Sequence, residues 1–162
     1  MTTIQCSIDT PVPEERVRAA LPDFSAARPA VWPNLDPSLY QVHDLGPACA
    51  DVTEGSRFGG GIWERASYDW ADPHRVNLTV TASNAFAPGS SWEYATTPQP
   101  GGGTHVELVV TRRGRTIKGR LLAALLRVSG RKVFCGDLAK TLRGLQDASP
   151  AAGREHRQGG DG

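Results

Sequence analysis

The spacing of apolar residues changes near Gly114, from every second residue before it to every third or fourth residue after it. The stretch at 75–84 alternates most regularly, with Val76, Leu78 and Val80 separated by polar residues. This alternation predicts a strand with one dry face. The later spacing predicts an amphipathic helix of about thirty residues.

Clusters of Gly, Pro, Asn and Asp divide the segment before Gly114 into short pieces, as in antiparallel hairpins. A short amphipathic helix and a proline-rich helical turn follow the first of these pieces, because "PEERVRAAL" has an acidic first turn and Trp32 stands among three prolines. The predicted strands are 3–9, 40–45, 50–54, 61–70, 75–84, 91–96 and 104–112.

The long helix is predicted to face the sheet with a single apolar stripe. Glycines within it cost about 1 kcal/mol each relative to alanine, so we expect either a bend near Ser129 and Gly130 or close packing against the sheet. Residues 1–147 are predicted to form one domain, and the Gly-rich residues 148–162 a disordered tail. The stripe consists of Ile117, Leu121, Leu125, Val128, Cys135, Leu138, Leu142 and Leu145.

Charge and composition argue against several classes of protein. The 162 residues carry 18 Lys and Arg against 17 Asp and Glu, with no basic run interleaved with aromatics, so we expect no nucleic-acid partner. No apolar run approaches the roughly 20 residues of a membrane span. The N-terminus lacks the features of a signal peptide, which predicts a cytoplasmic protein, as monomer or homodimer.

Metal and cofactor sites have no support in the sequence. Three widely spaced cysteines form no C-x-x-C pair, and four histidines lie far apart, so we expect no metal. The triple glycines at 59–61 and 101–103 lie among strands and not before a helix, which argues against a phosphate-binding loop. We expect no cofactor, and no nucleophile motif is present.

Four passages carry a resemblance to a known family: "PVPEERV", "VWPNLDPSLYQVHDLG", "YDWADPHRVNLTV" and "GRLLAALLRVSGRKVFCGDLAKTLRGL". With the order of elements, they resemble the START-like (SRPBCC) superfamily, and within it the bacterial polyketide cyclase/dehydrase and lipid-transport group. The resemblance implies the α+β helix-grip fold of START and Bet v 1 proteins. In that fold, a curved antiparallel sheet of about seven strands wraps around a long C-terminal helix, with two short helices after strand 1 and a cavity for mostly apolar ligands. Only some members are enzymes.

The catalytic candidates Glu64, Arg65 and Tyr68 lie on the strand at 61–70, whose side chains alternate between two faces. If Glu64 and Tyr68 face inward, a carboxyl group in an apolar wall can act as a general acid or base. If Trp63 and Arg65 face inward, the guanidinium can hold an enolate or a carboxylate. In a third interpretation, Glu64 and Arg65 face solvent and pair across strands.

Ligand-binding candidates come from both sides of the implied cavity. Trp92 and Tyr94 have flat rings with a polar tip that suit an aromatic ligand, although they can equally be core filler. Asn84 can orient a ligand carbonyl or satisfy its own turn. The expected set is Trp32, Trp63, Val76, Leu78, Val80, Asn84, Trp92, Tyr94, Leu121 and Leu125.

Two functions follow from this reasoning, and the sequence leaves both open. The first is binding of a small, largely hydrophobic or aromatic molecule between the sheet and the helix. The alternative is a polyketide cyclase or dehydratase that uses the same cavity, in which proximity contributes most of the catalysis. An interaction module of the same fold is a third option and requires an exposed apolar patch.

Overall fold

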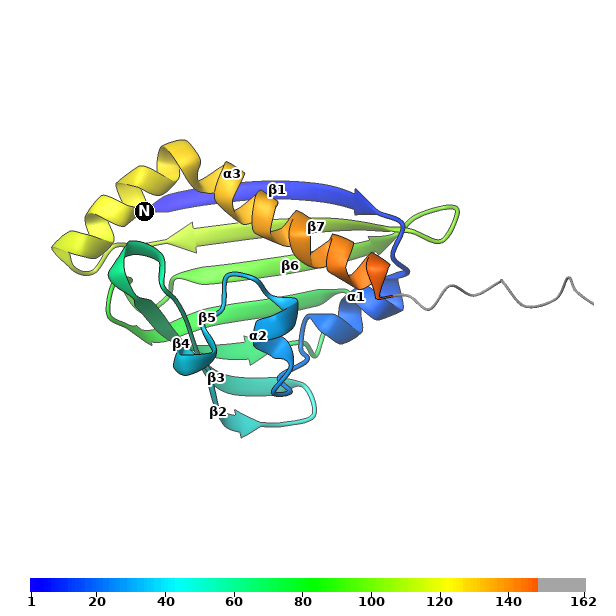
Figure 1. The fold of residues 1–162 in the computed structure, drawn as a ribbon, viewed down its shortest axis with the longest axis horizontal. Coiled ribbons are helices and arrows are strands. Elements are labelled where there is room, and N and C mark those ends of the chain that lie inside the picture. Colours follow the sequence, from blue (N-terminus) through cyan, green and yellow to red (C-terminus); the bar gives the residue numbers. More distant parts are fainter. Residues whose placement is uncertain (149–162) are drawn as a thin grey trace, which may run out of the picture.

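A computed structural model describes residues 1–148 as one antiparallel sheet with a long helix across it (Figure 1). The predicted disorder of the tail falls almost wholly on residues 149–162, which lie outside the described residues. Two 3-10 turns, η1 (Pro37–Leu39) and η2 (Phe58–Gly60), join the main elements. These elements are β1 (Thr2–Thr10), α1 (Glu14–Ala20), α2 (Arg28–Val31), β2 (Gln41–Leu45), β3 (Cys49–Ser56), β4 (Ile62–Asp69), β5 (Arg75–Ser83), β6 (Ser91–Pro98), β7 (Thr104–Arg112) and α3 (Ile117–Asp147).

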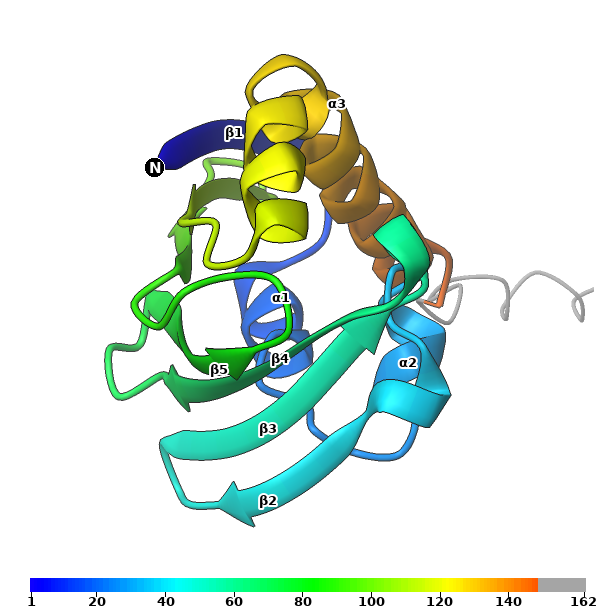
Figure 2. The same cartoon turned by 90° about the vertical axis from the view of Figure 1, so that its left-hand side faces the viewer.

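The seven strands form one sheet in the order β1-β7-β6-β5-β4-β3-β2. Strands β2 to β7 are successive hairpins, and β1 pairs with β7 so that Thr2 lies opposite Arg112. Register shifts at Val42/Asp44 and Arg65/Ala66 mark irregularities of the kind that bend a strand. Figure 2 shows the sheet curving beneath α3, so the predicted α+β helix-grip architecture is confirmed.

The dry face of the stretch at 75–84 turns toward α3. Val76, Leu78 and Val80 are all buried, and the polar residues between them lie on the outer side. The buried residues of β7 alternate in the same way, with Val106, Leu108 and Val110 inside. No helix within residues 1–148 is long and apolar enough to cross a bilayer.

Helix α3 bends part-way along its length, as Figure 1 shows. The Ser129 hydroxyl donates to the carbonyl of Leu125 at 3.2 Å, a hydrogen bond that often accompanies helix bending. A Cβ atom on Gly130 would lie 2.6 Å from Cδ1 of Ile4, so the helix and β1 are in close contact there. Both reasons that the sequence suggested for a glycine at this point are therefore present.

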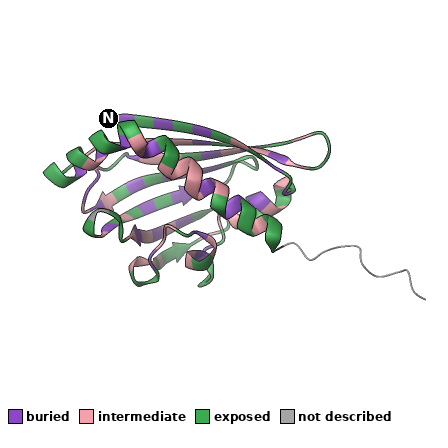
Figure 3. Cartoon of the chain, turned by 45° about the horizontal axis from the view of Figure 1, so that its top comes forward, coloured by how far each residue is buried: buried purple, intermediate pink, exposed green. Residues whose placement is uncertain are grey.

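The predicted stripe of α3 is right in the second half of the helix and wrong in the first. Leu138 and Leu142 are buried as expected. The four earlier members are between 52% and 89% exposed, and Figure 3 shows the first turns of α3 as largely exposed. These exposed members are Ile117, Leu121, Leu125 and Val128.

Small residues, not leucines, decide which side of the first half of α3 faces inward. Gly119, Ala123, Leu126 and Gly130 recur at steps of four, three and four, and all are buried. A Cβ atom on Gly119 would lie only 1.8 Å from the carbonyl oxygen of Ala85, so only glycine allows this approach. The inward face is fixed by this contact, and the leucine stripe consequently faces solvent.

Candidate functional site

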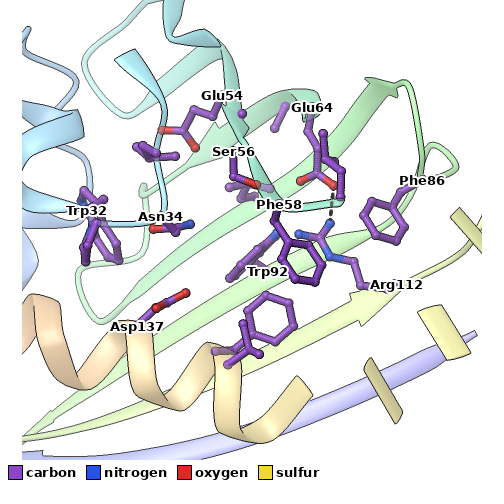
Figure 4. Close-up of a pocket in the computed structure, with 18 of the residues that line it drawn as sticks. Trp32, Asn34, Glu54, Ser56, Phe58, Glu64, Phe86, Trp92, Arg112 and Asp137 are labelled. Atoms are coloured by element: carbon purple, nitrogen blue, oxygen red, sulfur yellow. Dashed lines mark hydrogen bonds and ion pairs between the residues drawn. The ribbon is translucent and has the colours of Figure 1, made fainter. Parts of the chain in front are cut away.

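A cavity of about 400 Å³ lies between the inner face of the sheet, the α2 segment and α3 (Figure 4). Val76, Leu78 and Trp92 line it from the sheet, and Leu126 and Phe134 line it from α3. The rings of Trp92 and Phe134 meet edge to face, with centroids 4.9 Å apart. Most of the wall is therefore apolar or aromatic.

Two carboxylates stand opposite each other on the inner face of the sheet. Glu54 of β3 and Glu64 of β4 are direct cross-strand partners, and both line the cavity. Like charges in such a position destabilise a sheet unless each is neutralised. In Figure 4 the two carboxylates point apart, and a different arginine meets each of them.

Arg28 of α2 neutralises Glu54 in a three-residue cluster with Tyr68. Its Nε donates to Glu54 Oε1 at 2.5 Å, and its Nη1 donates to the carbonyl of Leu21 at 2.8 Å. The Tyr68 hydroxyl donates to Glu54 Oε2 at 2.5 Å and accepts from Arg28 Nη2 at 3.4 Å. The Arg28 guanidinium also lies 4.5 Å from the centroid of the Phe24 ring. This cluster attaches the short α2 helix to the sheet.

The protonation states in this cluster follow from burial and charge. Burial lowers the pKa of Arg28, but Tyr68 and Glu54 outweigh that effect and raise the pKa above its ordinary value. Burial raises the pKa of the Tyr68 hydroxyl well above its ordinary value, and Glu54 adds to the rise. At neutral pH the guanidinium is charged and the phenol keeps its proton.

Arg112 of β7 neutralises Glu64 at the other side of the cavity. Its Nη1 donates to Glu64 Oε1 at 2.8 Å. The guanidinium carbon lies 4.6 Å from the centroid of the Trp92 ring and 4.9 Å from that of Phe86, which is favourable for a cation between aromatic rings. Arg112 Nε is buried and has no hydrogen-bond partner within the described part of the chain.

Trp32 and Tyr94 close the cavity near α2. Their ring centroids lie 6.1 Å apart, edge to face, and both residues are buried. Burial raises the pKa of the Tyr94 hydroxyl, so this phenol is neutral at physiological pH. Trp32 Nε1 is a second buried donor without a partner among residues 1–148.

The structure brings most of the predicted site residues to this cavity. Glu64 and Tyr68 line it, which answers the question of which face of β4 is inward. Val80 is buried in the core and does not line the cavity. The predicted ligand-binding residues that line it are Trp32, Val76, Leu78, Trp92 and Tyr94.

Other predicted residues lie elsewhere. Trp63 and Arg65 are on the outer face of β4, where Arg65 Nη2 meets Asp51 Oδ2 at 2.5 Å. Leu121 and Leu125 are on the solvent side of α3, for the reason given above. Asn84 accepts from the backbone N–H of Trp63 at 3.1 Å and donates to the carbonyl of Gly61 at 3.0 Å. It therefore serves the local turn, which was one of its two predicted roles.

Sequence reasoning missed three charged residues of the cavity: Arg28, Glu54 and Arg112. The alternation of β7 carries a signal for Arg112, because Val106, Leu108 and Val110 continue in phase to that position. Glu54 follows Val52 in the same way on β3. Arg28 has no such signal, since α2 is a single helical turn.

Metal and nucleophile chemistry find no site in the described structure. No group of three His, Cys, Asp or Glu side chains within residues 1–148 could hold a metal ion. Burial raises the pKa of the Cys6 thiol to about 12, so this cysteine is protonated at neutral pH and is a poor nucleophile.

Comparison with known proteins gives a fold and no close relative. No family model matches the sequence, and no curated protein matches it. Among solved structures, the Zhui aromatase/cyclase from Streptomyces sp. R1128 superposes with a TM-score of 0.77 at 13% identity, over 93% of this chain and 97% of that one. A START superfamily protein from Mycobacterium smegmatis gives 0.73 at 12% identity, over 92% and 100%. The chain has the START-like helix-grip fold.

A further START-like neighbour, TTHA0849 from Thermus thermophilus, gives a TM-score of 0.75 at 18% identity, over 91% of this chain and 99% of that one. The predicted START-like resemblance is therefore confirmed at the level of fold. Identities this low carry no residue roles from these proteins to this one. The chemistry of this START-like chain has to be argued from its own cavity.

Proposed function

We propose that this START-like protein binds a small, largely hydrophobic or aromatic molecule in the cavity between its sheet and α3. The observation that carries the proposal is an interior space of about 400 Å³ whose apolar walls enclose two neutralised Arg–Glu pairs. Binding sites for small molecules typically have volumes of 300–1,000 Å³, mostly apolar walls and a few placed polar groups. A solid core would not retain this space.

The polar groups of the cavity favour a ligand that carries oxygen atoms. Glu64 and Arg112 present an acceptor and a donor beside the Trp92 ring, which suits a ligand hydroxyl and a ligand carbonyl on a flat framework. The cavity carries no net charge from the two pairs, so a neutral molecule is the better fit.

Native mass spectrometry of the purified protein tests binding directly. We expect a co-purifying small molecule, or uptake of polycyclic phenols offered to the protein. Leu122 lines the cavity and its neighbour Leu121 faces solvent, so Leu122→Trp should block binding while the size-matched Leu121→Trp should not. Equal binding by both variants, or a crystal structure with the space filled by side chains, would count against the proposal.

A cyclase or dehydratase activity is the second candidate, and one observation favours it. Glu64 and Arg112 form a contact at 2.8 Å in the wall of the cavity, with Trp92 beside them. A carboxylate can accept a proton from an activated carbon, and a guanidinium can stabilise the enolate that results. Holding a flexible chain in a folded shape supplies much of the barrier reduction for ring closure.

The two candidates differ in what happens to a bound ligand when Glu64 becomes Gln. For an enzyme, a poly-β-ketone probe should still bind to Glu64→Gln but should no longer be converted. Glu93→Gln is the matched control, because Glu93 lies on the exposed face of β6. Absence of any conversion by the unmodified protein would leave binding as the function.

A further inference from the structure

The solvent side of the first half of α3 carries an unusual row of aliphatic side chains. We call this row the outer stripe; it consists of Ile117, Leu121, Leu125 and Val128, and the exposed fractions of the first and last are 80% and 89%. The steps of four, four and three place them on one side of the helix, over a length of about 17 Å. None of them contributes to the cavity or the core.

A dense set of unpaired cations surrounds the outer stripe. Residues 113–132 contain seven Lys and Arg and no acidic residue, while the whole chain has a formal net charge of only +1. All seven are exposed, and none forms an ion pair within the part of the chain that the structure describes. They are Arg113, Arg115, Lys118, Arg120, Arg127, Arg131 and Lys132.

The cations lie along the edges of the outer stripe. Arg120, Arg127 and Arg131, at steps of seven and four, follow one edge, and Lys118 lies at the other. Lys118 Nζ donates to the carbonyl of Gly61 at 3.3 Å, so the η2 turn lies beside that edge. Phe58 of this turn is 49% exposed and also lines the cavity. The apolar surface thus continues from the helix to the lip of the cavity.

We propose that the outer stripe and its cations dock the protein on an anionic lipid surface. Aliphatic side chains flanked by Lys and Arg are the composition of helices that lie in the interface of a bilayer, with the apolar row among the acyl chains and the cations at the headgroups. Charge complementarity selects anionic lipids, because each cation near such a surface adds to the attraction. The proposal is independent of what the cavity holds.

Two other occupants fit the surface less well. A second copy of the chain, paired about a two-fold axis, would bring the seven cations against the same seven cations. The energetic centres of protein interfaces are rich in Trp, Tyr and Arg and poor in Leu and Val, whereas the outer stripe contains no aromatic residue. A bilayer requires neither shape complementarity nor aromatic anchors.

Co-sedimentation of the full chain with vesicles tests the proposal. We expect binding to vesicles of phosphatidylcholine mixed with phosphatidylglycerol, little binding to phosphatidylcholine alone, and weaker binding at high salt. Leu121→Gln with Leu125→Gln should weaken binding by at least about ten-fold, since two aliphatic side chains leave the interface. Arg120→Gln with Arg131→Gln should weaken it by about twenty-fold, at about five-fold for each cation.

Matched controls separate this surface from general charge and hydrophobicity. Arg18→Gln with Arg143→Gln removes the same charge from exposed positions outside residues 113–132, and Leu45→Gln removes an exposed leucine from β2. Both controls should bind vesicles as the unmodified protein does. Two results would overturn the proposal: no binding to anionic vesicles at low salt, or a dimer in analytical ultracentrifugation that dissociates in the Leu121/Leu125 variant.

Discussion

Removing one partner of the Glu64–Arg112 pair should destabilise the fold to a degree that depends on which partner goes. The side chains are 15% and 4% exposed. Glu64→Leu leaves a buried guanidinium that cannot lose its proton, and we expect it to lower the free energy of unfolding by about 3–5 kcal/mol. Arg112→Met leaves Glu64, which is closer to solvent and can take up a proton, so the loss should be about 1–3 kcal/mol.

The double variant separates the charge from the packing. Methionine keeps an apolar stem between the rings of Phe86 and Trp92, and leucine fills the place of the carboxylate. Replacing a buried ion pair by apolar residues of similar size is often neutral or stabilising, so the double variant should lie within about 1 kcal/mol of the unmodified protein.

Urea unfolding at neutral pH, with equal slopes for all variants, measures these differences. The control is the pair Asp51–Arg65 on the outer face of the same hairpin, where Arg65→Met and Asp51→Leu should change stability little. The reasoning is refuted if the two single losses simply add in the Glu64/Arg112 double variant, or if Arg112→Met costs more than Glu64→Leu.

Three further predictions concern other parts of the fold. Gly119→Ala should lower the free energy of unfolding by more than about 3 kcal/mol, since its Cβ would collide with a backbone carbonyl, whereas Gly136→Ala, with open space around it, should raise it by about 1 kcal/mol. Tyr68→Phe should cost about 1–3 kcal/mol because it leaves buried polar groups without their hydroxyl partner. Hydrogen bonds from the Ser38 side chain and its neighbours lower the pKa of Asp36 to about 2 from 3.8, so Asp36 stabilises the fold above pH 3.8 and loses this effect as pH falls toward 2.

Thermal or urea unfolding checks each of these predictions. A Gly119→Ala protein as stable as Gly136→Ala would show that α3 can shift away from the β5–β6 loop at no cost. Tyr68→Phe without effect would mean that the hydroxyl contributes nothing to the Arg28 cluster. For the acid response, Asp36→Asn should show a weaker dependence of stability on pH between 4 and 2 than the unmodified protein, and an unchanged dependence would contradict the assignment.

The alternation of side chains predicted the strands well because each strand of this sheet has one dry face. The same pattern in β4 could not tell which side was dry, since Ile62 and Trp63 are both apolar. In α3, hydrophobicity pointed to the wrong side because a glycine, which carries no hydrophobic signal, makes the closest contact. The arginine of α2 could not be predicted at all, since its position depends on how a single helical turn folds back onto β3.

The two facing carboxylates of β3 and β4 also have a consequence for how this sequence can change over time. Each of them is matched by an arginine that is distant in the chain: Glu54 by Arg28, and Glu64 by Arg112. A mutation at either end of a pair leaves a buried charge, so the first step is costly and the second restores the loss. In an alignment of homologous sequences, positions 28 and 54 should therefore vary together, and so should 64 and 112, with each pair independent of the other.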